Sequence, residues 1–214
     1  MINDNQVVFI ENLLLWHKLN KRDFFWRHNI SPYRIMIAEF MLQRTRAEQV
    51  EPVYKKFLQQ YPDVITLSKA KYKSVAKYTD KLGIHWRAKH FIDAAKYIVK
   101  ELNCKIPDNR NDLLKIPGIG DYVAGAILTV CYNKTEFVID SNIARFINRY
   151  YGLNLNGEIR RKKEIILKSI KIFHFSYTRK LLFALLDFTA IICKPNNPEC
   201  SICIFLNYCK YEKK

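Results

Sequence analysis

The chain has 214 residues, 49% of them hydrophobic, and 36 Lys and Arg against 20 Asp and Glu give it a formal net charge of +16. This length accommodates one large domain or two small lobes, each with its own core. The excess of positive charge favours a polyanionic partner, and nucleic acid is the first candidate.

Membrane and secretory proteins are excluded by two features of the sequence. The longest nearly apolar run, Leu181–Ile192, has 12 residues and includes an acid, so it is too short to cross a membrane. The polar N-terminus, MINDNQ, lacks the basic region of a signal peptide. We therefore expect a cytoplasmic protein with no membrane partner.

Helical periodicity dominates the chain, and no segment alternates convincingly with the period of a strand. Apolar residues recur at helical spacing in Ile35–Leu42, Val123–Val130, Ile143–Tyr150 and Lys180–Asp187. In the third segment the apolar residues share one face, so Arg145 and Arg149 are available to solvent or phosphate. The sequence predicts a mainly helical fold.

The segment NDLLKIPGIGDYVAGAILTV predicts a helix, a tight turn and a second helix. Pro117 ends the first helix, and Gly118 and Gly120, on either side of Ile119, permit positive φ and expose bare backbone. The free N–H groups at the start of the second helix can bind one phosphate. The segment is not a dinucleotide-binding fingerprint, because Val123 occupies the place of its third glycine. Binding of a DNA backbone is therefore favoured over an ordinary helical hairpin turn.

Three carboxylates stand in apolar stretches: Glu39, Asp140 and Asp187. Burial of a carboxylate is costly unless the group is hydrogen-bonded or used, and it tends to raise the pKa. Helix capping is the alternative to catalysis for each of them, and Asp187 fits capping best. Asp140 precedes a helix that we expect to begin near Ser141 or Asn142, so it also fits a cap.

Four cysteines near the end of the chain predict a metal site. Cys193, Cys200, Cys203 and Cys209 follow the pattern C-x6-C-x2-C-x5-C, and clustered cysteines in a cytosolic chain indicate metal rather than disulfides. The spacing suits a [4Fe-4S] cluster and does not exclude zinc. We expect the isolated Cys104 and Cys131 to be small buried hydrophobic residues.

The PGIG hairpin, an acid twenty residues beyond Gly120 and the cysteine tail together resemble the helix-hairpin-helix DNA glycosylases that carry an iron–sulfur cluster. The similarity runs from FFWRHNISPY to Cys209 and implies an all-α fold of two lobes. Residues 23–133 would form a six-helix barrel with the hairpin; residues 1–22 and 134–214 would form a helical lobe with Asp140 and the cluster. The active-site cleft would lie between the lobes, with the target base flipped into it.

The resemblance also implies a [4Fe-4S] cluster on the four cysteines, and a monomer in the nucleoid that binds mismatched double-stranded DNA. Lyase-competent relatives carry a nucleophilic lysine where this chain has Tyr122, so we expect a monofunctional enzyme. Asp140 would stay ionised to stabilise the oxocarbenium-like sugar and activate water. Tyr122 would position the base or sugar, and Glu39 would hydrogen-bond the flipped base or its water.

DNA contacts follow from the same resemblance. The hairpin residues Gly118, Ile119 and Gly120 would hold a phosphate. Arg44, at the place of the family's intercalating glutamine, would fill the space that the flipped base leaves in the DNA stack. His85 would be a second residue that inserts into the DNA.

Base specificity separates two monofunctional branches, the Mig-type thymine glycosylases and the MutY-type adenine glycosylases. Ala47 and the apolar Phe183 are more similar to the thymine branch, because adenine enzymes typically have valine and glutamine at these positions. Adenine enzymes also append a second domain, and this chain stops five residues after Cys209. We therefore expect removal of thymine or uracil opposite guanine in base excision repair. The alternatives are an adenine glycosylase and a non-catalytic iron–sulfur protein that binds DNA.

Overall fold

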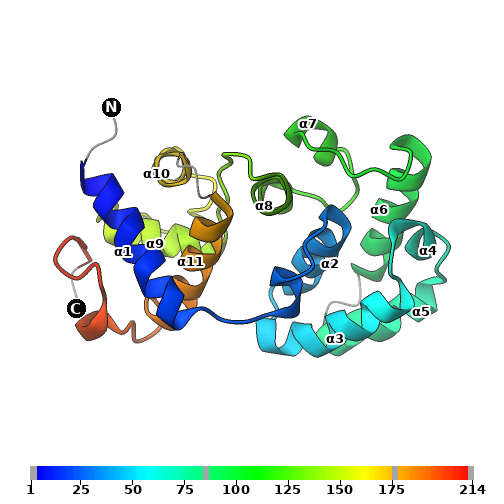
Figure 1. The fold of residues 1–214 in the computed structure, drawn as a ribbon, viewed down its shortest axis with the longest axis horizontal. Coiled ribbons are helices and arrows are strands. Elements are labelled where there is room, and N and C mark those ends of the chain that lie inside the picture. The colour runs from blue at the N-terminus through cyan, green and yellow to red at the C-terminus, as the bar shows by residue number, and fades with distance from the viewer. Residues whose placement is uncertain (1–3, 84–86, 175–177, 212–214) are drawn as a thin grey trace. The chain divides into compact units, whose positions relative to one another are not determined.

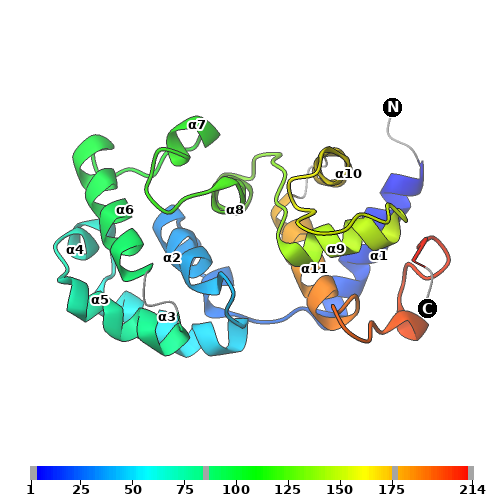
Figure 2. The same ribbon diagram turned by 180° about the vertical axis from the view of Figure 1, so that it is seen from behind.

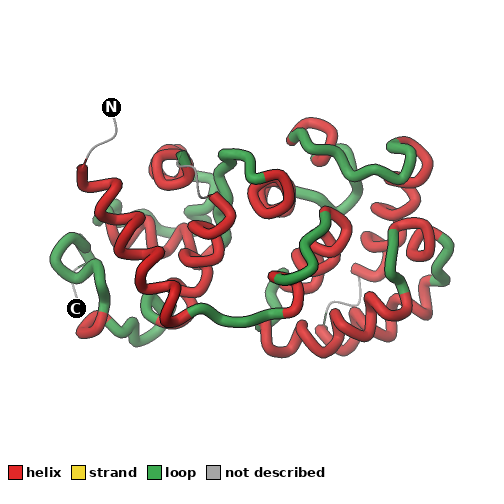
Figure 3. Tube along the Cα trace, viewed as in Figure 1, coloured by secondary structure: helices red, strands yellow, loops and turns green. Residues whose placement is uncertain are grey.

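The computed structural model describes residues 4–83, 87–174 and 178–211. Within these ranges the regular elements are helices, with no strand (Figure 3). The predicted all-α fold is therefore confirmed. The α-helices are α1 (Asp4–Asn20), α2 (Pro32–Leu42), α3 (Ala47–Gln60), α4 (Val64–Ser68), α5 (Tyr72–Thr79), α6 (Ala88–Glu101), α7 (Arg110–Leu113), α8 (Asp121–Tyr132), α9 (Ser141–Tyr150), α10 (Lys163–Phe173) and α11 (Thr178–Ile191). Short 3-10 turns are η1 (Phe25–Arg27), η2 (Asp80–Leu82) and η4 (Cys200–Ile202).

The chain divides into two compact units (Figure 1). The first unit contains residues 1–22 and 133–214, and the second contains residues 23–132. Both ends of the chain therefore belong to the first unit, and the second unit is inserted between α1 and α9. Figure 2 shows the helices of each unit from behind.

Helix α2 is the centre of the second unit. Ser31 caps its N-terminus by accepting a hydrogen bond from Arg34 N, and Pro32 occupies the first turn, where a missing N–H costs nothing. The seven consecutive residues of Ile35–Met41 are all buried, which marks a helix covered on every side. Helices α3 and α8 pack against it.

Aromatic rings fill the space between the helices of the second unit. The Phe91 ring lies 5.2 Å from Phe40 and 5.4 Å from Phe57, measured between centroids. All three side chains are at most 2% exposed. Burial of each such ring stabilises the fold by about 1.5–3 kcal/mol, so this cluster holds α2, α3 and α6 together.

The first unit is built on α11, against which both α1 and α9 pack. Its aromatic core surrounds Phe146 of α9. The rings whose centroids lie within 6.1 Å of Phe146 are those of Phe9, Tyr150, Phe188 and Phe205. The core therefore joins the first helix of the chain to its last structured turn.

Asp187 does not cap a helix, so the expectation from the sequence is wrong. It lies within α11, is fully buried, and accepts hydrogen bonds from three donors. Asp187 Oδ2 lies 3.0 Å from His17 Nε2 and 3.0 Å from the backbone N of Arg22. Asp187 Oδ1 lies 2.7 Å from Arg22 Nε. These donors compensate the burial of the charge. The carboxylate thus ties the end of α1 and the following turn to α11.

The isolated cysteines also differ from expectation. Cys104 is exposed and adopts a left-handed conformation with φ 63°, because it belongs to the turn that ends α6. Cys131, near the end of α8, is half-buried. Over the described ranges no helix is both long and apolar enough to span a membrane.

Candidate active site and candidate metal centre

Asp140 is the N-cap of α9. Its Oδ1 accepts a hydrogen bond of 2.7 Å from the backbone N–H of Ile143, and its own backbone is extended, with φ −89° and ψ 179°. The sequence left capping and catalysis open for this residue. The cap uses one carboxylate oxygen, and it orients the side chain at a helix N-terminus, where negative charge is favoured.

The second oxygen of Asp140 begins a chain of hydrogen bonds. Asn142 Nδ2 donates to Asp140 Oδ2 at 3.0 Å, and Arg145 Nη1 donates to Asn142 Oδ1 at 2.8 Å. The same guanidinium donates from Nη2 to the backbone oxygens of Thr189, at 3.1 Å, and Cys193, at 2.7 Å. Asp140 is thereby linked, through two side chains of α9, to the loop that carries the first cysteine.

Burial raises the pKa of Asp140 above its usual range. The hydrogen bonds donated by Ile143 N and Asn142 oppose this shift, as does the positive charge of Arg145. Desolvation penalises the charged carboxylate, and donors that face it favour that charge. The result is a half-buried acid held in one orientation by a defined set of donors.

The hairpin between α7 and α8 contains a tight turn. Ile119 N donates to Ile116 O at 3.1 Å, and Gly118 has φ 83°. With Pro117 before it, Gly118 occupies the position of a type II turn that requires positive φ. A Cβ on Gly118 would approach His90 Cβ and Phe40 Cζ to 3.2 Å. The predicted helix-turn-helix is present, and α6 and α2 support its turn.

Two details of the hairpin differ from expectation. Helix α7 ends at Leu113, before Pro117, because Lys115 and Ile116 already form turn hydrogen bonds to Asp112 O and Leu113 O. Gly120 does not have positive φ, and a Cβ there would meet nothing within 4 Å. Its backbone oxygen accepts from Ala124 N at 2.9 Å, so Gly120 precedes α8 as its cap residue.

Tyr122 and Glu39 belong to the second unit, whereas Asp140 belongs to the first. Tyr122 is half-buried in the first turn of α8. Glu39 lies within α2 and is 8% exposed, so it is not a cap residue. Burial of a carboxylate within the stretch Ile35–Met41 costs free energy of folding, and such a cost is typical of a functional position.

The residues expected to insert into the DNA or to set base specificity lie in different elements. Arg44 is exposed and left-handed, with φ 62°, in the turn between α2 and α3. Ala47 is half-buried as the first residue of α3. Phe183 is half-buried in α11, within the first unit. His85 lies outside the described residues.

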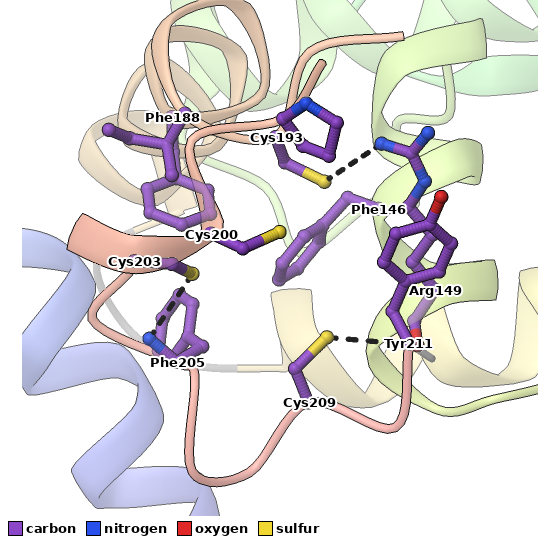
Figure 4. A pocket seen from close by; sticks show the side chains of 11 residues that line it. Phe146, Arg149, Phe188, Cys193, Cys200, Cys203, Phe205, Cys209 and Tyr211 are labelled. Carbon is purple, nitrogen blue, oxygen red and sulfur yellow. Dashed lines mark hydrogen bonds between the residues drawn. The ribbon is translucent and has the colours of Figure 1, made fainter. Parts of the chain in front are cut away.

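The four tail cysteines line one cavity. Cys193, Cys200, Cys203 and Cys209 share its wall with apolar and aromatic side chains that include Phe146, Phe188 and Phe205. Figure 4 shows the four sulfurs facing this common space. A second cavity of about 290 Å³ adjoins it and shares Cys200, Cys203 and Cys209.

Arg149 closes one side of this cysteine-lined cavity. Its Nη1 lies 3.7 Å from Cys193 Sγ and 2.6 Å from Lys194 O (Figure 4). Cysteine sulfur is the ligand of iron–sulfur clusters and one of the ligands of zinc. Over the described part of the chain, no three His, Cys, Asp or Glu side chains lie close enough together to hold a metal ion. The four thiols and their hydrophobic surroundings are the kind of donor set that a sulfur-ligated cluster uses, in which each cysteine binds a different iron.

The sequence did not identify the residues that hold these sites in place. Asn142 and Arg145 connect Asp140 to the cysteine loop, and Arg87 donates to Phe40 O and Gln43 O at the end of α2. Arg145 was expected to face solvent or phosphate, whereas its guanidinium faces backbone oxygens. The sequence carries no signal for these contacts, because a guanidinium needs acceptors but periodicity does not say which backbone oxygens supply them.

Comparisons with known proteins identify the family to which this chain belongs. Residues 37–170 match the family described as HhH-GPD superfamily base excision DNA repair protein. The chain is 34% identical to the adenine DNA glycosylase of Buchnera aphidicola subsp. Baizongia pistaciae over 95% of its own length, and it spans 58% of that relative. It is 30% identical to the thymine/uracil-DNA glycosylase of Methanothermobacter thermautotrophicus, over 99% of this chain and 96% of the relative.

Two solved structures superpose on this chain. A thermostable thymine-DNA glycosylase superposes with a TM-score of 0.89 at 31% identity, covering 96% of this chain and 95% of the other. Endonuclease III in a non-covalent DNA complex superposes with a TM-score of 0.80 at 16% identity, which indicates a shared fold.

Proposed function

Since this chain belongs to the HhH-GPD superfamily of base excision DNA repair proteins, we propose that it is a monofunctional DNA glycosylase that removes thymine or uracil mispaired with guanine. Asp140 carries this proposal. It is a carboxylate with a raised pKa, held by a helix N-terminus and a side-chain donor, in a chain with a basic surplus and a supported hairpin.

In the proposed reaction, the bond between C1′ of the sugar and the base nitrogen breaks, and its electron pair leaves with the base. Positive charge develops on the sugar, and the ionised Asp140 stabilises it from nearby. A water then adds its oxygen to C1′ and loses a proton to the carboxylate or to bulk water, while the departing base gains a proton. The products are the free base and an abasic site.

The second unit supplies the remaining groups in this proposal. Glu39 hydrogen-bonds the flipped base or its water, and Tyr122 positions the base or sugar. Tyrosine has no amine to form an imine with the opened sugar, so strand cleavage by a lyase step is not expected. Gly118 and Gly120, on either side of Ile119, present backbone N–H groups of the hairpin to one phosphate.

The identity of the base rests on Ala47 and Phe183. A methyl group and a phenyl ring offer no partner for the hydrogen-bonding edge of adenine, whereas they accommodate the 5-methyl group of thymine. The adenine alternative has its own support, because an adenine glycosylase is among the relatives with 34% identity. Base specificity is therefore the property to measure first.

A panel of end-labelled duplexes tests the proposal under single-turnover conditions. The duplexes contain G·T, G·U, A·8-oxoguanine, A·G or thymine glycol, and alkali cleaves any abasic site. We expect excision from G·T and G·U at least about tenfold faster than from A·8-oxoguanine, a difference of about 1.4 kcal/mol in barrier. Asp140→Asn is the inactive control. Preference for A·8-oxoguanine would establish the adenine alternative, and DNA binding without release of any base would establish a non-catalytic protein.

We also propose that Cys193, Cys200, Cys203 and Cys209 hold a [4Fe-4S] cluster. When bound, the cluster would fix the tail loop through four iron–thiolate bonds, and Arg149 would offset negative charge at Cys193. Protein purified without oxygen should contain about four irons per chain and absorb near roughly 400 nm. Stoichiometric zinc would contradict the cluster. Cys200→Ser should lower iron content and solubility, with Ser201→Ala as the matched control.

A further inference from the structure

The turn between α2 and α3 holds an arginine in a conformation that side chains rarely adopt. Gln43 has φ −61° and ψ 114°, Arg44 has φ 62°, and Thr45 N donates to Leu42 O at 3.2 Å. These values define a type II turn with Arg44 at the position that favours glycine or asparagine. A side chain with a Cβ is strained there, and such strain persists only where the surroundings enforce it.

Arg87 holds the turn in this conformation through hydrogen bonds to its backbone. It is 4% exposed, and its Nη1 donates to Phe40 O at 3.1 Å and to Gln43 O at 2.9 Å. The last carbonyls of a helix have no partner within the helix. Arg87 therefore satisfies two oxygens at the end of α2, and one of them belongs to the turn itself.

A second contact fixes the far side of the turn. Thr45 Oγ1 donates to Leu82 O at 3.4 Å, and Leu82 is buried at the end of η2. Arg44, between the two anchored residues, is exposed. Burial first, and the charge of Arg44 second, lower the pKa of Arg87, so the two guanidinium groups are close enough to repel each other.

We propose that Arg87 is a positioning residue for base opening, which holds the turn so that the Arg44 side chain projects into the DNA stack. This inference rests on the proposed function, because it assigns Arg87 a part in flipping the target base. Arg87 itself touches neither the base nor the reacting atoms. Its removal should impair the opening of a paired base and spare the hydrolysis of a base that is already unpaired.

Arg87→Met keeps the apolar stem and removes the donors, and Arg87→Lys keeps a charge and a donor. Arg161→Met is the matched control, because Arg161 is exposed in the other unit. The first measurement compares single-turnover excision of thymine paired with guanine and of thymine opposite an abasic-site analogue. The second uses 2-aminopurine beside the mismatch in the Asp140→Asn background, where fluorescence reports unstacking without base release.

Arg87→Met should slow excision from G·T at least about tenfold and change excision opposite the abasic-site analogue by less than about threefold. The 2-aminopurine signal should fall at saturating protein, Arg87→Lys should recover part of it, and Arg161→Met should match the unmodified protein. Equal losses on both thymine substrates, or an unchanged fluorescence signal, would overturn the inference.

Two safeguards keep the test decisive. If thermal unfolding shows that Arg87→Met does not fold, Thr45→Val replaces it, because it loses only the hydroxyl contact with Leu82 O. That variant should show the same selective loss at smaller size, and equal rates on both substrates would again overturn the inference. Failure of the proposed function is distinguishable, since the unmodified protein would then release no thymine from G·T, whereas the unstacking signal would still be measurable in the Asp140→Asn background.

Discussion

Removal of the Asn142 side chain should change the pH at which the enzyme becomes inactive. Asn142 Nδ2 donates to Asp140 Oδ2 at 3.0 Å and opposes the rise in the pKa of that carboxyl. The reaction requires the ionised form, so activity is lost as the pH falls through the pKa of the folded protein. Asn142→Ala should therefore move the acidic limb of the pH–rate profile to higher pH.

The size of the effect follows from the strength of the contact. A hydrogen bond to a charged group contributes about 1.5–3 kcal/mol, and half-burial of both partners reduces this by roughly half. Since about 1.36 kcal/mol corresponds to one pH unit, the midpoint of the limb should move up by roughly half a unit to one unit. Single-turnover excision from G·T at a series of pH values measures it, with the exposed Asn156→Ala as the matched control.

Stability should respond to pH in the opposite sense. Burial raises the pKa of Asp140 in the folded state, so the favourable contribution of the protonated form is complete below the unfolded pKa and is lost as the pH rises through the folded pKa. The fold thus favours the protonated carboxyl, and the reaction needs the ionised one. A midpoint in Asn142→Ala that stays fixed or moves to lower pH would refute the role of this hydrogen bond.

Three further predictions concern the candidate site. Asp140→Asn should be inactive but at least as stable as the unmodified protein, because asparagine also caps helices and adds no buried charge, whereas Asp140→Ala should be about 1 kcal/mol less stable than Asp140→Asn in denaturant unfolding; equal stabilities of the Ala and Asn variants would show that the cap contributes nothing. Borohydride should trap little covalent protein–DNA product from the unmodified protein and more from Tyr122→Lys, since only an amine forms an imine; strong trapping without the substitution would contradict a monofunctional enzyme. Phe183→Gln combined with Ala47→Val should shift excision from thymine towards adenine in the duplex assay, and an unchanged ratio would place base specificity elsewhere.

The sequence predicts local structure well in this chain, because the relevant signals are local. The apolar run Ile35–Leu42 lies within α2. Asp140 stands immediately before α9 and caps it, as an acid at that position suggests. Pro117 and Gly118 predict a tight turn, and the structure has one of the type that this pair favours. Gly120 shows the limit, since glycine permits positive φ without requiring it.

Contacts between distant residues could not be predicted in the same way. Arg145 meets the backbone of Cys193 across 48 positions, and Asp187 meets His17 across 170. Periodicity places each of these side chains on a helix face and says nothing of which backbone oxygen or carboxylate faces it. The left-handed Arg44 was equally hidden, because its conformation is imposed by Arg87 and Thr45 rather than by its own residue type.

The insertion of the second unit between α1 and α9 has a consequence for synthesis on the ribosome. Helix α1 emerges first, but its partner α11 follows about 170 residues later, as the His17–Asp187 separation records. At about 5–20 residues per second this interval lasts roughly ten to thirty seconds. The second unit is continuous in the chain and can fold during that time, while Phe9 and Leu13 of α1 still lack the neighbours that bury them. The nascent chain therefore exposes these apolar side chains of α1 until α11 has been made.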